Sequence, residues 1–289
     1  MKKIFLLTAV ALITANSAQA QTDIPLNEEV MYFEIDDMPN AVNWLPAPPD
    51  FNSTQFSYDL TQYMQGKWER LNEERRQQAI DNSVVDMADM AKQFSIPFGM
   101  EISEEKTPCI FKVLDRGVTS IRLCASKPKI AFARKRPYVL YNEPTLIPEA
   151  EETLRENGSY PSGHSMRGWA TALLLCEINP DAQDEILELG YQWGQSRVIA
   201  GYHWQSDVDA ARLLASAGYA RLHTSQEFLA DMAAAQAEYA RLSGKTSGVA
   251  AAKVDTTTHS AAIYNMAGKQ LSEKPQTGLY IQSGKKSVK

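Results

Sequence analysis

The sequence predicts an all-α protein, a helical bundle followed by a short β appendage. Two observations carry this prediction. Apolar residues recur at helical spacing from about Phe56 to Leu242, and strand-like alternation is scarce over the same residues. After Leu242 the composition changes to small and polar residues, and two short strand-like segments follow around Gly-containing turns.

Residues 1–20 are expected to be a secretory signal peptide. Lys2 and Lys3 precede an apolar run over residues 4–13, and the sequence AQA at 18–20 has the small-x-small pattern of a cleavage site. The run is too short to span a bilayer, and no later stretch is long and apolar enough. We therefore expect cleavage after Ala20 and a mature protein in the periplasm, secreted or at the cell surface.

The remaining chain is expected to contain a domain, a linker and a tail. Residues 21–243 form the predicted domain, and its first part, to about residue 56, is rich in Pro, Asn and Asp and should be extended. Residues 244–260 have a linker composition. Residues 261–289 are expected to form a β tail, too short to hold a core of its own.

The helices of the domain follow from separate apolar repeats. Residues 107–137 carry apolar positions at helical spacing and are expected to run as one helix into Pro137, at Ile110, Val113, Leu114, Ile121 and Cys124. Residues 164–178 are expected to present one apolar face, formed by Met166, Trp169, Leu173 and Leu174. Further helical patterns cover residues 181–197, 207–222 and 225–242.

Export makes the three cysteines relevant, because exported proteins meet oxidising conditions. Cys109 and Cys124 are near neighbours in sequence, with Cys176 further on. On one continuous helix their sulfurs would lie about 22 Å apart, at 1.5 Å per residue, which is too far for a bond. The spacing therefore argues against a Cys109–Cys124 bond, and no disulfide pairing is assigned from the sequence.

Charge argues against a nucleic-acid partner. The whole chain has a net charge of −6. The leader contributes two lysines, and residues 244–289 contain seven Lys against two acidic residues, so residues 21–243 have a net charge of −13. Such a body does not resemble a nucleic-acid binder, and any basic cluster within it is conspicuous.

The first such cluster is "KIAFARKRP", residues 129–137. Lys129 and Arg136 are seven residues apart, nearly two helical turns, so on a helix both would point the same way. Two cations on one face repel unless an anion lies between them. The alternative is a solvated basic end of a helix, which suits the negative pole of the helix.

The second candidate is "GSYPSGHS", residues 158–165, directly before a strong helical pattern. The amides near Ser162 and Gly163 could turn toward an anion at the helix N-terminus, where His164 also lies. The alternative is a helix cap made by Ser162 or Ser165, with His164 a bystander.

The third is "SRVIAGYHWQSD", residues 196–207. Gly201 is expected to end the helix that carries Arg197, and Ser206 with Asp209 to cap the next one. His203 would then lie in a turn between helices, where Asp207 could hold one ring nitrogen and leave the other free to attack. The alternative is a His–Asp pair that only stabilises the turn.

Together the three segments supply what phosphoryl transfer requires. Lys129, Arg136 and Arg197 provide cations, the loop amides provide neutral donors, and two histidines provide a nucleophile and an acid. In the order Lys129-x6-Arg136-Pro137, Pro161-Ser-Gly-His164 and Ser196-Arg197-x5-His203-x3-Asp207, the segments resemble the three-part signature of the PAP2 superfamily. That group includes bacterial acid phosphatases, lipid phosphate phosphatases and vanadium haloperoxidases.

The chain is most similar to the class A non-specific acid phosphatases, over roughly residues 44–225. The segments "LPAPPDFNSTQFSYD", "GSYPSGHS" and "SRVIAGYHWQSDVDAAR" carry this similarity. Two departures are visible. Ser165 stands where the family commonly has Thr, and the segment around Arg75 and Arg76 differs from the usual Pro-Arg-Trp, which could alter the rim of the pocket.

The resemblance implies a helical bundle of the PAP2 and haloperoxidase type and a role for each residue. His203 would attack phosphorus and form a phosphohistidine, Asp207 would orient it, and His164 would act as general acid and base. The phosphate oxygens would be held by five residues: Lys129, Arg136, Ser162, Gly163 and Arg197. No metal and no cofactor are implied, and no metal-ligand spacing is seen in the sequence.

The implied activity is that of a metal-independent acid phosphatase, a hydrolase of phosphomonoesters of broad range, with inorganic phosphate and vanadate as inhibitors. A vanadate-dependent haloperoxidase or a phosphotransferase on the same site is the alternative. Oligomeric state is left open. Residues 263–289 are also similar to the sorting tails of the type IX secretion system, against a plain β appendage as the alternative.

Overall fold

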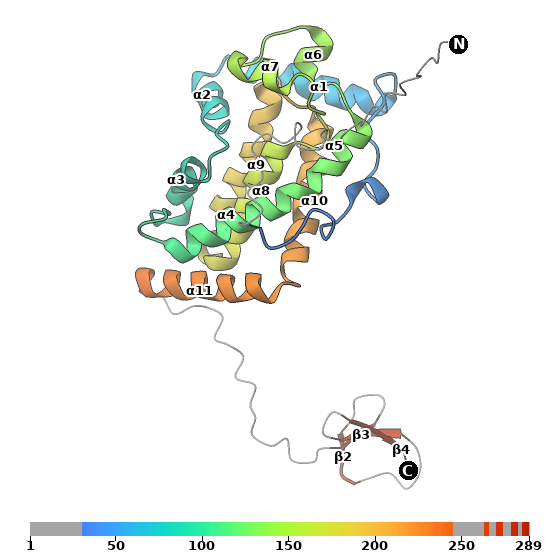
Figure 1. Ribbon diagram of the computed structural model, residues 1–289, viewed down its shortest axis with the longest axis vertical. Coiled ribbons are helices and arrows are strands. Elements are labelled where there is room, and N and C mark those ends of the chain that lie inside the picture. Colours follow the sequence, from blue (N-terminus) through green and yellow to red (C-terminus); the bar gives the residue numbers. More distant parts are fainter. Residues whose placement is uncertain (1–30, 245–262, 266–269, 274–278, 283–284, 289) are drawn as a thin grey trace, which may run out of the picture. The chain divides into compact units, whose positions relative to one another are not determined.

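The structure is a computed structural model that describes residues 31–244, 263–265, 270–273, 279–282 and 285–288 of the 289-residue chain. The chain divides into two compact units, residues 1–246 and 247–289. All regular elements of the first unit are helices within its described residues (Figure 1), which confirms the predicted all-α class. The predicted signal peptide, and all but the first residue of the predicted linker, lie outside the described residues.

The α-helices of the first unit are α1 (Thr54–Glu69), α2 (Glu73–Asp81), α3 (Met87–Phe98), α4 (Pro108–Arg122), α5 (Ser126–Phe132), α6 (Pro137–Tyr141), α7 (Glu151–Leu154), α8 (Gly163–Ile178), α9 (Gln183–Ile199), α10 (Gln205–Leu222) and α11 (Gln226–Ser243). Single turns of 3-10 helix lie before α1, at Ala41–Asn43 (η3), and between later helices, at Leu123–Ala125 (η4), Pro148–Ala150 (η5) and Pro180–Ala182 (η6).

Helix α8 is the central element of this unit (Figure 1), because α4, α9, α10 and α11 all pack against it. Met166 and Leu174 are fully buried, whereas Trp169 and Leu173 are half-buried. The predicted single apolar face is therefore wrong. A helix surrounded by others buries residues all around its circumference, and the side with Trp169 and Leu173 is the less buried one.

Helices α8 and α9 approach closely at a glycine. A Cβ atom at Gly168 would lie 2.4 Å from side-chain atoms of Trp193, which no real side chain tolerates. Gly190 of α9 similarly faces Ala172 of α8. The contacts move forward along α8 as they move backward along α9, so the two helices run antiparallel. The same register places His164, in the first turn of α8, opposite Arg197, in the last turn of α9.

The basic segment is not the single helix that the sequence predicts. Helix α4 ends at Arg122, and α5 ends at Phe132, before Ala133, which adopts a left-handed conformation with φ 41°. Pro128 in the first turn of α5 cannot donate a helical hydrogen bond, so a break before it is favourable. Pro137 begins α6 instead of ending a helix, a position that suits its fixed φ.

Helix α10 begins one residue after Trp204, earlier than predicted. The Trp204 N–H donates to Asp207 Oδ2 at 2.8 Å. The predicted capping pair of Ser206 and Asp209 is therefore wrong, and Asp207 itself closes the first turn. His203 lies in the turn between α9 and α10, as predicted, after Gly201 at φ 87°.

The second unit contains a four-stranded antiparallel sheet of order β2-β1-β3-β4 within its described residues. The strands are β1 (Ile263–Asn265), β2 (Gln270–Leu271), β3 (Leu279–Gln282) and β4 (Lys285–Val288). Ile263 pairs with both Leu271 and Gln282, so β1 lies between β2 and β3. The predicted strands are thus present, and the Gly-containing turns predicted between them lie outside the described residues.

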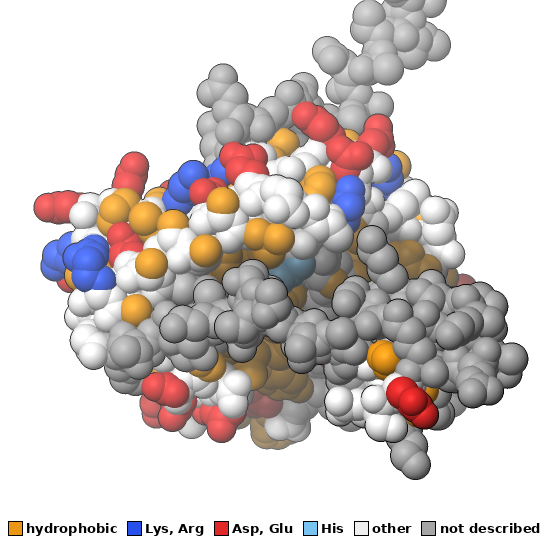
Figure 2. All heavy atoms as spheres, turned by 90° about the horizontal axis from the view of Figure 1, so that it is seen from below, with side chains coloured by type: hydrophobic (Ala, Val, Ile, Leu, Met, Phe, Trp, Pro, Cys, Tyr) orange, Lys and Arg blue, Asp and Glu red, His pale blue; other side chains and the backbone are white. Residues whose placement is uncertain are grey.

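The face drawn in Figure 2 shows acidic and basic side chains in small separate groups, with apolar side chains scattered between them. No continuous basic patch crosses the described atoms of that face, as expected for an acidic body. Among the described helices, none combines the length and the apolar character that crossing a bilayer would require. The three cysteines are free thiols.

Candidate active site

A cavity of about 230 Å³ opens where α8 begins and α9 ends. His164 and Arg197 both line it, as the antiparallel register of the two helices requires. The other lining residues come from the loop before α3 and from the segment around η5 and α7: Ser83, Val85, Ile147, Ala150, Thr153, Leu154 and, after α9, Tyr202. Two of the eight residues predicted to form the site therefore share one cavity.

His203 lies against a buried carboxylate. Its Nδ1 is 3.3 Å from Asp207 Oδ2 and 3.2 Å from Ser159 Oγ. Ser159 Oγ donates to the same carboxylate oxygen at 2.5 Å. All three residues are buried, His203 with 2% of its surface exposed. Asp207 is thus near enough to orient the ring, as the sequence predicts, with Ser159 as a partner that sequence reasoning missed.

The other ring nitrogen of His203 faces a cation. Arg136 Nη1 lies 3.0 Å from His203 Nε2. A guanidinium group has only donors, so this contact requires an unprotonated Nε2. The ring proton of a neutral His203 then resides on Nδ1, where it can be donated to Asp207. This tautomer leaves the Nε2 lone pair on the side of the cations.

Lys129 and Arg136 meet at one amide side chain. Lys129 Nζ donates to Asn157 Oδ1 at 3.1 Å, and Arg136 Nη2 donates to the same oxygen at 3.1 Å. Arg136 Nε also donates to the Asn157 carbonyl at 2.9 Å. The two cations are therefore brought together, but by Asn157 and not by a shared helical face as predicted.

Gly158 allows the close passage of the chain that this arrangement needs. Lys129 Nζ donates to the Gly158 carbonyl at 2.6 Å. A Cβ atom at position 158 would lie only 2.5 Å from the Lys129 carbonyl oxygen, so any larger residue would push the two segments apart. The glycine that opens "GSYPSGHS" thus has a packing role beside Lys129.

The loop before α8 combines a helix cap with a link to α10. Ser162 is the N-cap residue, and its Oγ accepts hydrogen bonds from the backbone N–H and the hydroxyl of Ser165. The Ser162 N–H donates to the Asp207 carbonyl at 3.1 Å. The Ser162 amide is therefore occupied. Of the two predicted donors, the amide of Gly163, the first residue of α8, is the one that can donate to an anion.

His164 and Arg197 are both held by local contacts. His164 Nε2 lies 3.0 Å from the Ser83 carbonyl oxygen, an acceptor, so this nitrogen carries a proton. The Arg197 guanidinium stacks on the Tyr202 ring at 4.3 Å. The Arg197 carbonyl accepts from the backbone N–H groups of Tyr202 and His203, which ties His203 to the end of α9.

Two tyrosines near the site stay neutral at working pH. Burial raises the pKa of Tyr160 to about 12, and the nearby carboxylate of Asp207 adds to the effect. Burial is also the main cause of the raised pKa of Tyr202. Both phenols therefore keep their protons at acidic and neutral pH, and neither serves as a general base there. No group of three or more His, Cys, Asp or Glu gathers to hold a metal ion in the described part of the chain.

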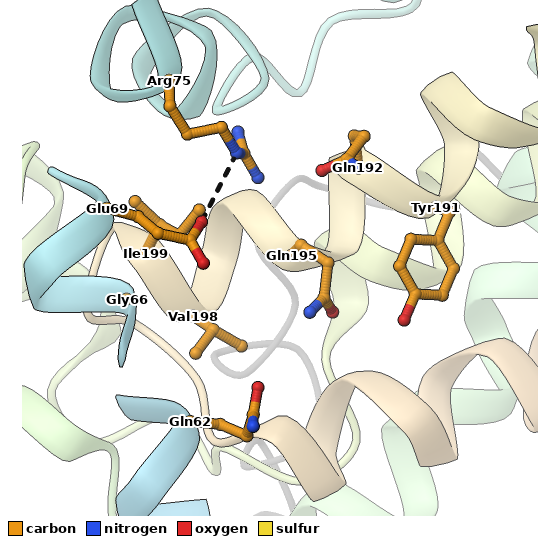
Figure 3. Close-up of a pocket in the computed structure, with 9 residues that line it drawn as sticks. All are labelled: Gln62, Gly66, Glu69, Arg75, Tyr191, Gln192, Gln195, Val198 and Ile199. Atoms are coloured by element: carbon orange, nitrogen blue, oxygen red, sulfur yellow. Dashed lines mark ion pairs between the residues drawn. The ribbon is translucent and has the colours of Figure 1, made fainter. Parts of the chain in front are cut away.

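Arg75 does not line the cavity of His164. It lines a second cavity of about 250 Å³ between α1, α2 and α9, where it points toward Glu69 with an ion-pair distance of 3.8 Å (Figure 3). Arg75 Nη1 donates to Ser196 Oγ at 3.1 Å. The unusual segment around Arg75 therefore contacts the residue before Arg197 and does not form the rim that the sequence suggested.

Cations, a carboxylate and two histidines lie around one end of a helical bundle, and these are the groups that binding of an oxyanion requires. A model of the PAP2 superfamily matches residues 116–228. The chain is 40% identical to a non-specific acid phosphatase of Providencia stuartii over 221 residues, 76% of this chain and 89% of the relative.

A non-specific acid phosphatase of Salmonella typhimurium is 36% identical over 82% of this chain and 93% of its own length. An acid phosphatase of Zymomonas mobilis is 34% identical over 55% of this chain and 61% of its own. The chain belongs to the PAP2 superfamily, among its bacterial non-specific acid phosphatases. The acid phosphatase activity predicted from the sequence is confirmed at this level.

Proposed function

We propose that the chain hydrolyses phosphomonoesters through a phosphohistidine on His203. The observation that carries this proposal is the pair of contacts on the His203 ring, with Arg136 at Nε2 and Asp207 at Nδ1. A neutral ring in this tautomer is ready for attack, and its lone pair points to the cations that would hold the phosphate.

The reaction then proceeds in two displacements. The Nε2 lone pair of His203 forms the P–N bond while the ester P–O bond breaks, and protonated His164 gives its proton to the leaving oxygen. Neutral His164 next removes a proton from water, whose oxygen attacks phosphorus as the P–N bond breaks. Asp207 stabilises the positive ring of the intermediate, and phosphate leaves with His164 protonated again.

The negative charge of the transferred group would be neutralised by Lys129, Arg136 and Arg197, with the Gly163 amide as a neutral donor. Phosphoryl transfer is catalysed mainly by such positioning and charge stabilisation. Lys129 and Arg136 both donate to Asn157 Oδ1 in the structure. When substrate binds, they would donate to phosphate oxygens instead. Inorganic phosphate and vanadate, which present the same oxygens, are expected inhibitors.

The cavity favours a single phosphate on an apolar or aromatic alcohol. Its wall carries Val85, Ile147, Ala150 and Leu154, and Arg197 is the one Lys or Arg among its lining residues. That cation is assigned to the transferred phosphate. A second phosphate on the substrate would meet no cation of the wall, whereas a ring or alkyl chain would bury apolar surface against it.

The test is to trap the intermediate. Purified protein is dialysed against a chelator, mixed with radiolabelled 4-nitrophenyl phosphate, and quenched in alkali, which preserves phosphohistidine. We expect label on the wild-type protein and none on His203→Ala, which also loses turnover. His223→Ala, a histidine paired with Glu177 away from these motifs, serves as control and should keep both. Turnover by His203→Ala in a clean preparation would contradict the proposal.

The export signals are part of the same proposal. We propose that residues 1–20 are removed and that the protein works in the periplasm, outside the cell or at its surface. Residues 261–289 would act as a secretion sorting signal. The mass of the exported protein, compared with that of the full chain, shows which segments are removed, and an exported protein that keeps residues 1–20 would contradict the proposed leader.

A further inference from the structure

A buried chain of charges extends behind Asp207. Arg134 Nη1 donates to Asp207 Oδ1 at 2.6 Å, and Arg134 Nη2 donates to Asp59 Oδ2 at 2.7 Å. The side chains of Asp59 and Asp207 are fully buried, and that of Arg134 is 3% exposed. Neither Asp59 nor Arg134 belongs to the three-part signature.

The three residues come from separate parts of the fold. Asp59 lies in α1, Arg134 in the extended stretch after Ala133, and Asp207 in the first turn of α10. Ser206 completes the cluster, because its N–H and its hydroxyl donate to the two Asp59 oxygens at 2.7 and 2.6 Å. The cluster therefore joins α1 to the start of α10, next to His203.

The two oxygens of Asp207 have different partners. Oδ2 faces His203 Nδ1, Ser159 and the Trp204 N–H, whereas Oδ1 accepts from Arg134. Arg134 thus fixes the rotation of the carboxylate from the side opposite His203. Movement of this carboxylate by 1 Å would turn the His203 ring away from its line of attack.

We propose that Asp59 and Arg134 are positioning residues for phosphoryl transfer, acting on His203 through Asp207. Arg134 holds the carboxylate, and Asp59 offsets the charge of Arg134, so that Asp207 keeps its stabilising effect on the positive ring of the phosphohistidine. This inference rests on the proposed function of His203. Its consequence is that the orientation of the nucleophile depends on α1, which lies some 140 residues earlier in the sequence.

The charges explain why both members are needed. Alone beside Asp207, a buried Arg134 would neutralise the carboxylate that the intermediate requires. Without Arg134, two buried carboxylates would remain with no cation between them, and such uncompensated charges are costly in a protein interior. The charges of Asp59, Arg134 and Asp207 together leave one net negative charge, which faces the His203 ring.

A tie between α1 and α10 could instead serve stability alone, and the two roles differ in kinetics. Asp59→Asn keeps the shape and an oxygen that can accept from the Ser206 N–H, but it removes the charge and replaces the acceptor oxygen that faces Arg134 with an NH2 donor. We expect its kcat to fall at least tenfold, with KM and the inhibition constant for inorganic phosphate within twofold of wild type, because the phosphate cations are untouched. Single-turnover measurements should assign the loss to formation and breakdown of the phosphoenzyme.

The matched control is Arg116→Gln. Arg116 also bridges two carboxylates, Glu227 and Asp231, and none of the three belongs to the signature. This variant should lose thermal stability and keep kcat within twofold. Arg134→Lys, which retains the charge but cannot reach both carboxylates, should lower kcat at least fivefold, and it decides the question if Asp59→Asn does not fold.

Folded Asp59→Asn with kcat within twofold of wild type would overturn the inference, and so would a loss confined to KM. His203→Ala is measured alongside. If it is inactive while Asp59→Asn is fully active, the positioning role fails and the nucleophile stands. If His203→Ala is active, the proposed function fails first and this inference with it.

Discussion

Arg136 Nη1 and His203 Nε2 lie 3.0 Å apart in a buried setting, so the cation and the proposed nucleophile are in direct contact before any substrate arrives. Since the guanidinium can only donate, the contact selects the histidine tautomer with a free lone pair on the correct nitrogen. A phosphate oxygen that binds Arg136 is thereby brought beside the atom that is to attack. Binding and activation share one residue.

His164 is expected to matter most for poor leaving groups. His164→Ala should lower kcat for an alkyl phosphate about 10²–10⁴-fold, the usual range for general acid catalysis. The first step with 4-nitrophenyl phosphate should be affected less, because 4-nitrophenolate leaves without a proton. Rapid-quench assays on both substrates measure the difference, and an equal loss on both would contradict the acid role.

Activity should peak on the acid side of neutrality. His164 must begin protonated while His203 begins neutral, so high pH removes the acid and low pH blocks the nucleophile. A pH–rate profile of kcat/KM for an aryl phosphate checks this. A maximum well above pH 8 would be inconsistent with these two roles.

Val85 tests the apolar wall of the cavity. Val85→Ser should lower kcat/KM for 1-naphthyl phosphate about tenfold. A loss of this size corresponds roughly to the transfer free energy of one such side chain. Glycerol 3-phosphate, which has little apolar surface, should change by less than twofold. Val42→Ser, an exposed valine in η3, is the control and should alter neither. Equal losses on both substrates would count against an apolar leaving-group site.

Gly158→Ala should damage both stability and activity. The new Cβ would lie 2.5 Å from the Lys129 carbonyl, and overpacking of this kind costs about 1–3 kcal/mol. Displacement of Lys129 should also lower kcat/KM at least fivefold. Gly99→Ala strains a left-handed position at φ 78° with no neighbour within 4 Å, so it should cost stability alone. Thermal melts and steady-state kinetics separate the two effects.

Asp115→Asn should stabilise the protein near neutral pH. Burial, with repulsion from Asp86 and Glu104, raises the pKa of Asp115 above its ordinary value of 3.8. Ionisation of the folded protein is thus opposed, so Asp115 lowers the free energy of unfolding above its raised pKa, and this cost disappears as pH falls toward 3.8. The Tm gain of the variant should shrink over the same range. A gain independent of pH would point to another cause.

The helical class and the chemistry of the site could be predicted because both depend on patterns among residues that are close together in the sequence. Apolar spacing marked α4 and α8 through α11, and the three motifs named the residues that now lie near one another. Asn157 could not be predicted, since an amide that holds two cations has no local pattern. The break at Ala133 was missed for a related reason, because the apolar and basic spacing continues across it.

The close contact of Gly168 with Trp193 also has a meaning for mutational tolerance. Because α8 carries His164 and α9 carries Arg197, the span between these two groups is set by how near the helices can approach at Gly168 and Trp193, four residues along each helix from His164 and Arg197. A saturation screen for lost activity should therefore recover position 168 as readily as the two histidines. In this protein, core packing sets the distance between the reactive groups.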